Sequence, residues 1–550
     1  MSTLPELQKS LLESEDLLLR VEATLLFPHI GGYSTLPFDS TMQILEPPRP
    51  TEIKALWRWW ARVILSAAYG GSKNYEALDR EVGELLGKTY GEALSSLFTL
   101  RVNCSNLNEI NEIFVKFYKD HLQRYERIDS KLKELFTDLI KKPFKINIEF
   151  RSFGAIDVVF KESLPKDVRE KLKRSNLRVR KKRGHYILTI SHNNFNNIVR
   201  IPNIDNVKYN NLIIDLNEYF KYRRISRIFI ISQIKEEEEQ KDFRKRLAIE
   251  AAILDTFKNF NLKITIDLFI VSPQSDVLNK LKNGLKFALL SYVVSLLFGA
   301  IGYASRRGFG SIIIEEVQEG PALRTFISDL SDIKESISKL KSEESPEEIE
   351  RILKELLQKT YNKAKEYAKV RDEGRVTIGI PQVPTALLDD CFKIKVFKCK
   401  SPLHALRCIS KATLKEEWKD LVGARRRPGG EFHTWILGLP RSVKGCGYFM
   451  GKYRENRGRR PSAFHFKLLK NSKGTFIVVY GFLSRDWPVD SLYHFSCGHG
   501  HFPVKNSKIA TPSSRKLSPS NNTEIFLRQV FRSAFDFIIE IIKKCCSNGE

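Results

Sequence analysis

A glycine-rich segment constrains the fold of this chain more than any other feature. Four glycines fall within residues 299–310, between an apolar stretch that ends at Phe298 and a β-branched pattern that begins at Ser311. We expect a helix over 276–298 and a strand over 311–317. Glycine permits a positive φ and lets backbone N–H groups approach an anion. The segment therefore predicts either a tight structural turn or a contact with phosphate.

The side chains of this segment favour the phosphate interpretation. Arg306 and Arg307 bring positive charge, Phe309 offers a ring for stacking, and Gly308 and Gly310 flank that ring. The segment lacks the Gly-Lys-Ser/Thr ending of a P-loop, so we expect no nucleotide hydrolysis. The uncharged stretch before it approaches the length of a membrane span. Its serines and glycines favour a buried helix instead, and we predict no membrane partner.

A second segment, the helix expected over 51–69, combines cations with tryptophans. Thr51 is a plausible N-cap. At about 100° per residue, Trp57 and Trp60 share an apolar face that we assign to the core. Lys54, Arg58 and Arg62 form a separate cationic stripe, and the Trp59 ring lies outside both faces. We predict that these four side chains contact nucleic acid. The alternative is a basic face that is simply solvated.

The order of the expected elements predicts an α+β protein whose N-terminal half has the ferredoxin-like (RRM-type) arrangement, and it leaves open that the two halves are distant copies of one fold. In the N-terminal half the helices are expected over 51–69, 106–142, 235–258 and 276–298. The strands are expected over 17–27, 144–160, 185–191, 225–234, 262–271 and 311–317.

The C-terminal half offers strands near 375–380, 392–397, 431–437, 463–469 and 475–482, and a closing amphipathic helix over 523–544. We therefore divide the chain into an N-terminal domain over 1–320, a helical connector over 321–372 and a C-terminal domain over 373–550. A basic insertion lies around 161–260, and its segment 161–183 is expected to be partly mobile. Pro346 falls inside the connector.

The charge of the chain predicts a polyanionic partner. Lys and Arg total 91 against 65 Asp and Glu, which gives a net charge of +26, while hydrophobic residues make up 42%. Such a surplus is typical of nucleic-acid-binding proteins. The second half adds cations interleaved with aromatics and glycines, a pattern that suits single-stranded RNA: Arg425, Arg426, Arg427, Arg441, Lys452, Arg454, Arg457, Arg459 and Arg460.

The eight cysteines do not predict a metal site. No secretory signal is evident at the N-terminus, so we expect reduced thiols in a cytoplasmic protein. Cys391, Cys399 and Cys408 lack the short spacing of a zinc knuckle, and Cys545-Cys546 is interpreted as incidental. The remaining cluster matches no ligand pattern: His494, Cys497, His499 and His501. We expect no metal and no cofactor.

The motifs resemble those of the RAMP superfamily of CRISPR proteins, and within it the Cmr subunit-one family of the type III-B Cmr effector complex. Residues 56–62 and 304–311 resemble the basic-aromatic helix and the glycine loop of that family, and residues 437–440 and 459–466 also fit. The chain departs from the family at Ile53-Lys54-Ala55, where Arg-Gly is more frequent. The resemblance covers both ends of the chain but neither the basic insertion nor the connector.

The resemblance implies two ferredoxin-like domains and a non-catalytic RNA-binding role. The expected partners are CRISPR guide RNA, target RNA and other Cmr subunits, with the chain capping the complex near the 3′ part of the guide. Target cleavage and cyclic-oligonucleotide synthesis belong to other subunits of such complexes. Two alternatives stay open: a metal-independent RAMP ribonuclease that uses His29 as acid or base, and a structural subunit whose basic surfaces meet acidic proteins.

Overall fold

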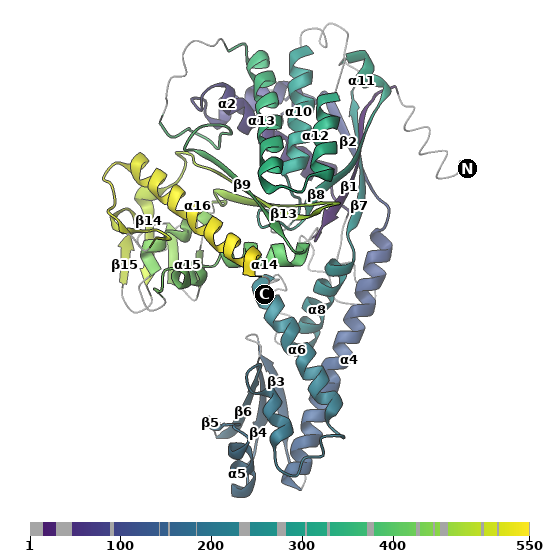
Figure 1. The fold of residues 1–550 in the computed structure, drawn as a ribbon, viewed down its shortest axis with the longest axis vertical. Helices are drawn as coiled ribbons and strands as arrows, with labels where there is room; N and C mark the ends of the chain where they lie inside the picture. The colour runs from purple at the N-terminus through teal and green to yellow at the C-terminus, as the bar shows by residue number, and fades with distance from the viewer. Residues whose placement is uncertain are drawn as a thin grey trace, which may run out of the picture. The chain divides into compact units, whose positions relative to one another are not determined.

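The chain is a mixed α+β protein with several small antiparallel sheets (Figure 1). The structure is a computed structural model. Its described residues are 15–28, 47–88, 93–141, 144–151, 155–182, 184–229, 243–271, 282–302, 305–326, 331–370, 379–424, 429–439, 441–443, 446–450, 460–496, 500–513 and 516–548. Two compact units result: Asn108–Phe260 forms most of one, and Leu45–Leu107 and Asn261–Glu550 form most of the other.

The larger unit contains a four-stranded antiparallel sheet from the N-terminal half. Its strands are β1 (Leu17–Leu26), β2 (Phe98–Cys104), β7 (Leu262–Ile270) and β8 (Ser311–Glu319), in the spatial order β2-β7-β1-β8. Helix α2 (Pro50–Ala68) follows β1, and α10 (Lys282–Phe298) follows β7. The elements of this sheet therefore follow one another in the order β–α–β–β–α–β.

A buried ion-pair cluster joins three strands of this sheet. Asp267 on β7 is fully buried and accepts hydrogen bonds from Arg20 on β1 (2.6 Å) and from the Arg101 Nε on β2 (3.1 Å). Both arginines face Asp267 in the strand register. Strand β2 was not predicted from the sequence, although its apolar residues Phe98, Leu100, Val102 and Cys104 alternate with polar ones.

A second, three-stranded antiparallel sheet comes from the C-terminal half. It has the order β12-β13-β9 and consists of β9 (Phe392–Cys399), β12 (Phe464–Asn471) and β13 (Gly474–Phe482). Helix α14 (Pro402–Ala412) follows β9, and α16 (Thr523–Asn548) comes after β13. The described residues thus give a β–α–β–β–α order without a fourth strand.

Another small sheet of the C-terminal half has the order β10-β11-β14-β15. Its strands are β10 (Arg441–Val443), β11 (Cys446–Met450), β14 (Leu492–Ser496) and β15 (Gly500–Pro503). None of these four strands was predicted from the sequence.

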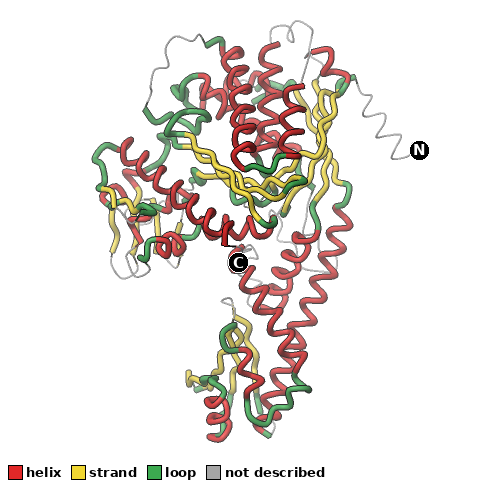
Figure 2. Tube along the Cα trace, viewed as in Figure 1, coloured by secondary structure: helices red, strands yellow, loops and turns green. Residues whose placement is uncertain are grey.

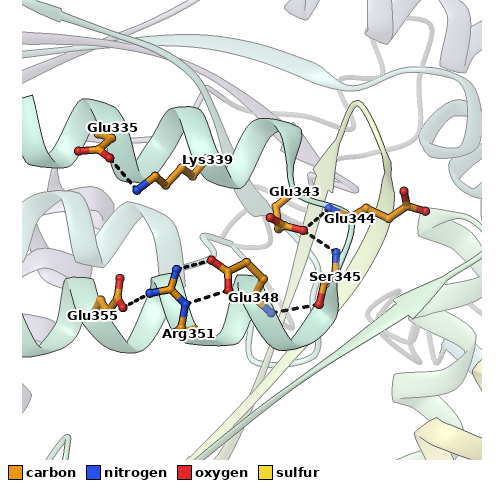
Figure 3. A network of polar contacts seen from close by, with 8 residues as sticks. All are labelled: Glu335, Lys339, Glu343, Glu344, Ser345, Glu348, Arg351 and Glu355. Carbon is orange, nitrogen blue, oxygen red and sulfur yellow. Dashed lines mark hydrogen bonds and ion pairs between the residues drawn. The ribbon is translucent and has the colours of Figure 1, made fainter.

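The described part of the expected connector over 321–372 contains three helices, of which the first is α11 (Pro321–Phe326). Helix α12 (Ser331–Ser342) ends before residues 343–345, and α13 (Pro346–Ala368) begins with Pro346 in its first turn. The Ser345 hydroxyl accepts a hydrogen bond from the Glu348 N–H at 3.2 Å, as Figure 3 shows. Proline is tolerated at the first helical position because its missing N–H is not needed there. Helix α13 packs against α2, α10 and β9.

The smaller unit is built on the long helix α4 (Leu107–Ile140). Its four-stranded antiparallel sheet has the order β3-β4-β6-β5, and helices α6 and α8 also belong to it (Figure 2). The core residues come from the helices and the sheet together. The bounds of these elements are β3 Ile146–Arg151, β4 Ala155–Phe160, α5 Lys166–Arg174, β5 Val179–Lys182, β6 His185–Ser191, α6 Asn210–Phe229 and α8 Phe243–Asn259.

Several expectations about local structure were wrong. Helix α2 begins at Pro50, so its cap is Arg49 rather than Thr51, and the Glu52 carboxylate accepts from the Arg49 N–H. Residues 225–229 are helical, not a strand, and residues 431–437 form two short 3₁₀ segments. The basic segment 161–183 contains helix α5 and strand β5, and its partial mobility stays a prediction. The strand expected near 375–380 falls mostly outside the described residues.

The cysteines also differ from expectation. Disulfides join Cys399 to Cys546 and Cys408 to Cys545, where we expected reduced thiols and an incidental Cys545-Cys546 pair. None of the described helices has the length and apolar character needed to cross a bilayer.

Candidate nucleic-acid interface

Three segments that the sequence singled out meet in the larger unit. They are helix α2, the glycine-rich segment after α10, and strand β12. The Trp59 ring on α2 stacks on the His465 ring on β12, with ring centroids 5.2 Å apart. The Phe466 N–H on β12 donates to the Arg306 carbonyl at 3.0 Å. Residues far apart in the chain therefore form one continuous patch.

The centre of this patch is a stack of three rings. His465 lies between Trp59 and Tyr480, whose centroid is 5.1 Å away at an interplanar angle of 21°. Burial, assisted by the charge of Arg306, holds the pKa of His465 well below its usual range. The imidazole is therefore neutral near pH 7. Trp59, expected at an exposed edge, is half-buried in this stack, whereas Trp57 and Trp60 are fully buried, as predicted.

The cationic stripe of α2 is engaged within the chain. Lys54 donates to the Phe98 carbonyl at 3.1 Å, and Arg58 donates to the Leu86 carbonyl at 2.6 Å. Arg62 forms an ion pair with Asp79 at 3.0 Å. Burial and the neighbouring Arg58 lower the pKa of Lys54. The predicted contact of this stripe with successive phosphates stays a prediction, and each cation would have to share or leave its present partner.

The glycines of the segment serve the turn itself. Gly308 and Gly310 have φ values of +88° and +63°, a region that favours glycine. The Gly310 N–H donates to the Phe27 carbonyl at 3.0 Å, and a Cβ on Gly310 would lie 1.9 Å from the Ile301 oxygen. Phe309 is 8% exposed and packs edge-on against Phe27. Close packing therefore accounts for the glycines whether or not a phosphate binds.

Two arginines of the patch differ in their surroundings. Arg460 donates to Ser484 at 3.2 Å, pairs with Asp486 and lies over the Trp487 ring at 4.6 Å. Arg306 is half-buried, and among the described residues no carboxylate pairs with it. Burial is the main cause that lowers the pKa of Arg306, and Arg460 adds to it.

Tyr75 lies near a third arginine, Arg62, as well as near Arg306 and Arg460. Tyr75 is 39% exposed, and its hydroxyl donates to Asp486 at 3.3 Å. Partial burial and Asp486 raise the pKa of Tyr75 to about 12, while Arg460 and Arg62 act in the opposite direction. Tyr75 also acts electrostatically on Arg306. We call Arg62, Arg306 and Arg460 the arginine cluster. It is the part of the patch with an excess of positive charge.

Lys467 supports the patch from its buried side, and the sequence analysis did not identify it. This lysine is 1% exposed, and its Nζ donates to the carbonyls of Leu296 (3.1 Å), Gly299 (2.6 Å) and Ile312. Burial lowers its pKa well below the usual range. The signal in the sequence is a lysine between two apolar residues of a strand whose faces are both covered.

Most of the second basic cluster cannot be placed. Arg307 is exposed and Arg460 is half-buried. Arg441 lies in β10, and its side chain is outside the described part. The other residues of this cluster lie outside the described residues: Arg425, Arg426, Arg427, Lys452, Arg454, Arg457 and Arg459. The same is true of His29, the residue of the catalytic alternative.

The histidine cluster near residue 494 is only partly described. Cys497 and His499 lie outside the described residues. The His494 Nε2 is 3.1 Å from the Lys415 Nζ, and burial together with Lys415 lowers the pKa of His494 to about 3. A neighbouring ammonium on a ring nitrogen does not favour a metal there.

Comparison with known proteins supports the resemblance seen in the motifs. No family model matches the sequence. A curated relative, the "CRISPR system CMR subunit Cmr1" of Saccharolobus solfataricus, is 26% identical over 318 residues, which is 56% of this chain and 56% of the relative. The match thus spans little more than half of each protein. Because this relative carries the name of the family that the motifs resemble, the resemblance is confirmed.

Solved structures of the same kind align over most of the chain. Chains of the type III-B Cmr-beta complex bound to cognate target RNA align at 17% identity, one with AMPPnP and ssDNA present (TM-score 0.47, 95% of this chain and 100% of that chain) and one without (0.44, 94% and 100%). Apo Cmr1 from Pyrococcus furiosus aligns at 13% identity and a TM-score of 0.36, over 86% of this chain and 90% of that one.

Proposed function

We propose that this Cmr1-like chain is a non-catalytic RNA-binding subunit of a type III-B CRISPR effector ribonucleoprotein. It binds guide and target RNA together with other Cmr subunits, caps the end near the 3′ part of the guide and helps to capture target RNA. Its fold is built on two ferredoxin-like domains. The family motifs, the curated relative and the net charge of the chain support this proposal.

One observation carries it: the half-buried guanidinium of Arg306 has no carboxylate partner among the described residues. A buried charge without a counter-ion is costly, and Arg460 beside it raises that cost. An RNA phosphate would supply the missing charge and accept hydrogen bonds from the planar guanidinium, which suits phosphate recognition. The arginine cluster is therefore the best-supported place for the RNA backbone.

Binding at this cluster reads charge and shape rather than sequence. Phosphate contacts position a nucleic acid but carry no sequence information. The ring stack beside the cluster is already closed by Tyr480, whose hydroxyl donates to the Phe298 carbonyl at 2.7 Å. The Trp59 ring therefore contributes to the packing beneath the surface. An RNA base could contact this stack only at its edge.

The test compares variants in their binding to labelled single-stranded RNA. We expect Arg306→Gln to weaken binding to unrelated RNA sequences by the same factor. The slope of log affinity against log salt should fall by about 0.7, the value of one phosphate contact on a single strand. Arg306→Lys should recover part of the affinity. Arg351→Gln is the matched control, because Arg351 is exposed and paired with Glu348 and Glu355.

An unchanged affinity in Arg306→Gln would contradict the proposed site, and a loss limited to one RNA sequence would contradict backbone recognition. RNA cut into discrete products in the presence of EDTA, with the products lost in His29→Ala, would replace the proposal with a ribonuclease. Weak RNA binding together with stable capture of other Cmr subunits would favour the structural alternative.

A further inference from the structure

Four cysteines and one histidine from three elements meet near the end of α16. Cys399 ends strand β9, Cys408 lies on α14, and Cys545 and Cys546 lie near the end of α16. The sulfurs of Cys399, Cys408 and Cys546 lie within 4.8 Å of one another, and so do those of Cys408 and Cys545 with a ring nitrogen of His404. Cys408 belongs to both groups and is fully buried.

The approach of the two disulfides to each other is the informative feature. Two disulfides could link these elements even if the disulfides lay far from each other. Here the Sγ atoms of Cys408 and Cys546, which belong to different disulfides, are 3.9 Å apart. Four thiolates around a tetrahedral zinc ion, with Zn–S bonds of about 2.3 Å, are separated by about 3.8 Å. The distance between the disulfides thus matches an edge of such a tetrahedron.

The charges around the cluster favour thiolates. Three of the four cysteines have a cation as their neighbour in the chain, because Lys400 follows Cys399, Arg407 precedes Cys408 and Lys544 precedes Cys545. Nearby positive charge lowers the pKa of a thiol. It also offsets the net negative charge of a zinc ion with four thiolate ligands. The surroundings therefore suit a metal–thiolate centre better than four neutral thiols.

We propose that the reduced chain binds one Zn²⁺ through Cys399, Cys408, Cys545 and Cys546. An external dithiol first reduces each disulfide, which gains two electrons and two protons while the dithiol becomes oxidised. Zinc then displaces the protons of the four thiols. Four protein ligands leave no open position, as in structural zinc sites, so the ion fastens α16 to α14 and β9. This site is separate from the proposed RNA-binding role.

The experiment uses the full chain purified with a dithiol reductant in the presence of zinc. Native mass spectrometry and zinc analysis should find one zinc per chain. The four thiols should react with a thiol reagent only after a chelator removes the metal. Cys408→Ser should lose the zinc, whereas Cys104→Ser, which alters a cysteine outside the cluster, should keep it. His404→Ala should also keep it.

A second measurement covers the case in which Cys408→Ser fails to fold. Wild-type protein reconstituted with Co²⁺ should show intense sulfur-to-metal charge-transfer absorption, which reports thiolate ligation directly. The proposal is overturned if the reduced wild type holds no zinc and its cluster thiols react as fast as Cys104. It is equally overturned if His404→Ala loses the metal, or if the purified chain carries an iron–sulfur chromophore instead.

Discussion

Lys467 on β12 helps to join the three-stranded sheet of the larger unit to the four-stranded sheet that contains β8. Its Nζ donates to three carbonyls, which belong to α10, the glycine-rich segment and β8. A polar group in a dry site is costly unless its donors are satisfied. The three carbonyls at the end of α10 and beside it supply that compensation, helped by the negative end of the helix dipole.

We expect Lys467→Met to lower the free energy of unfolding of the larger unit by about 1–3 kcal/mol, because it leaves buried carbonyls without a donor. Urea unfolding followed by tryptophan fluorescence measures the change. Lys470→Met on the same strand, where the side chain is exposed, is the control and should change little. Equal stability of the two variants would mean that the buried amine is not stabilising.

His433 makes stability depend on pH. Its Nδ1 accepts from the Trp435 indole at 3.1 Å, its Nε2 lies 3.1 Å from the Lys508 carbonyl, and burial lowers its pKa to about 4. In the unfolded chain the pKa is about 6.5. The unfolded chain therefore gains a proton first on acidification, so this contribution is complete above pH 6.5 and is lost as the pH falls towards 4.

We expect His433 to account for a loss of about 1.4 kcal/mol in stability for each pH unit below 6.5. Urea midpoints at pH 7 and pH 5 test this. In His433→Asn, which suits the left-handed backbone at φ +45°, the difference between the two midpoints should shrink. The exposed His501→Asn should leave it unchanged, and a full pH difference in His433→Asn would argue against this residue.

At the scale of elements, the break between α12 and α13 depends on a cap. The Ser345 hydroxyl satisfies an N–H of the first turn of α13, next to Pro346 (Figure 3). Because α13 packs on α2 and α10, fraying of its first turn would loosen the helical layer over the sheet.

We expect Ser345→Ala to lower stability by about 1 kcal/mol, the usual effect of losing an N-cap. Thermal unfolding followed by circular dichroism measures the change. Ser338→Ala, in the interior of α12 and exposed, should be neutral or slightly stabilising because alanine is the better helix former. A stable Ser345→Ala variant would show that packing alone sets the start of α13.

Element order could be predicted from the sequence much better than side-chain partners. The apolar helix before the glycines and the strands of β12 and β13 follow from periodicity alone. Strand β2 was missed although apolar and polar residues alternate along it. Residues 431–437 leave the strand conformation where His433 has a positive φ. The partner of Arg58 is a carbonyl at the end of helix α3 (Tyr75–Leu86), which only tertiary structure brings near.

At the scale of the whole molecule, residues 108–260 interrupt a continuous strand pair. Strands β2 and β7 are antiparallel neighbours, with Cys104 opposite Ile264. Just beyond them the Asn106 amide donates to the Asn261 carbonyl at 2.9 Å, and its oxygen accepts from the Lys263 N–H at 2.9 Å. The chain thus leaves and re-enters the larger unit at one place, as in a domain inserted at a hairpin.

We expect a variant in which a short Asn-Gly turn replaces residues 107–260 to fold, because such a turn suits a two-stranded hairpin. It should keep at least the RNA affinity that the arginine cluster provides, since none of that cluster lies in the removed part. Cooperative thermal unfolding and the salt-dependent RNA titration test this. Failure to fold, while the control with a Gly-Ser linker inserted after Asn106 folds, would show that the larger unit needs the insertion.

The enclosure of Lys467 also has a chemical consequence. An amine surrounded by three carbonyls is inaccessible to acylating reagents while the two sheets remain joined, whereas the exposed Lys470, three residues away, reacts at once. The ratio of modification at these two lysines, measured by peptide mass spectrometry, therefore reports how often the two sheets separate. The same measurement could be made on the unsubstituted chain inside a cell extract.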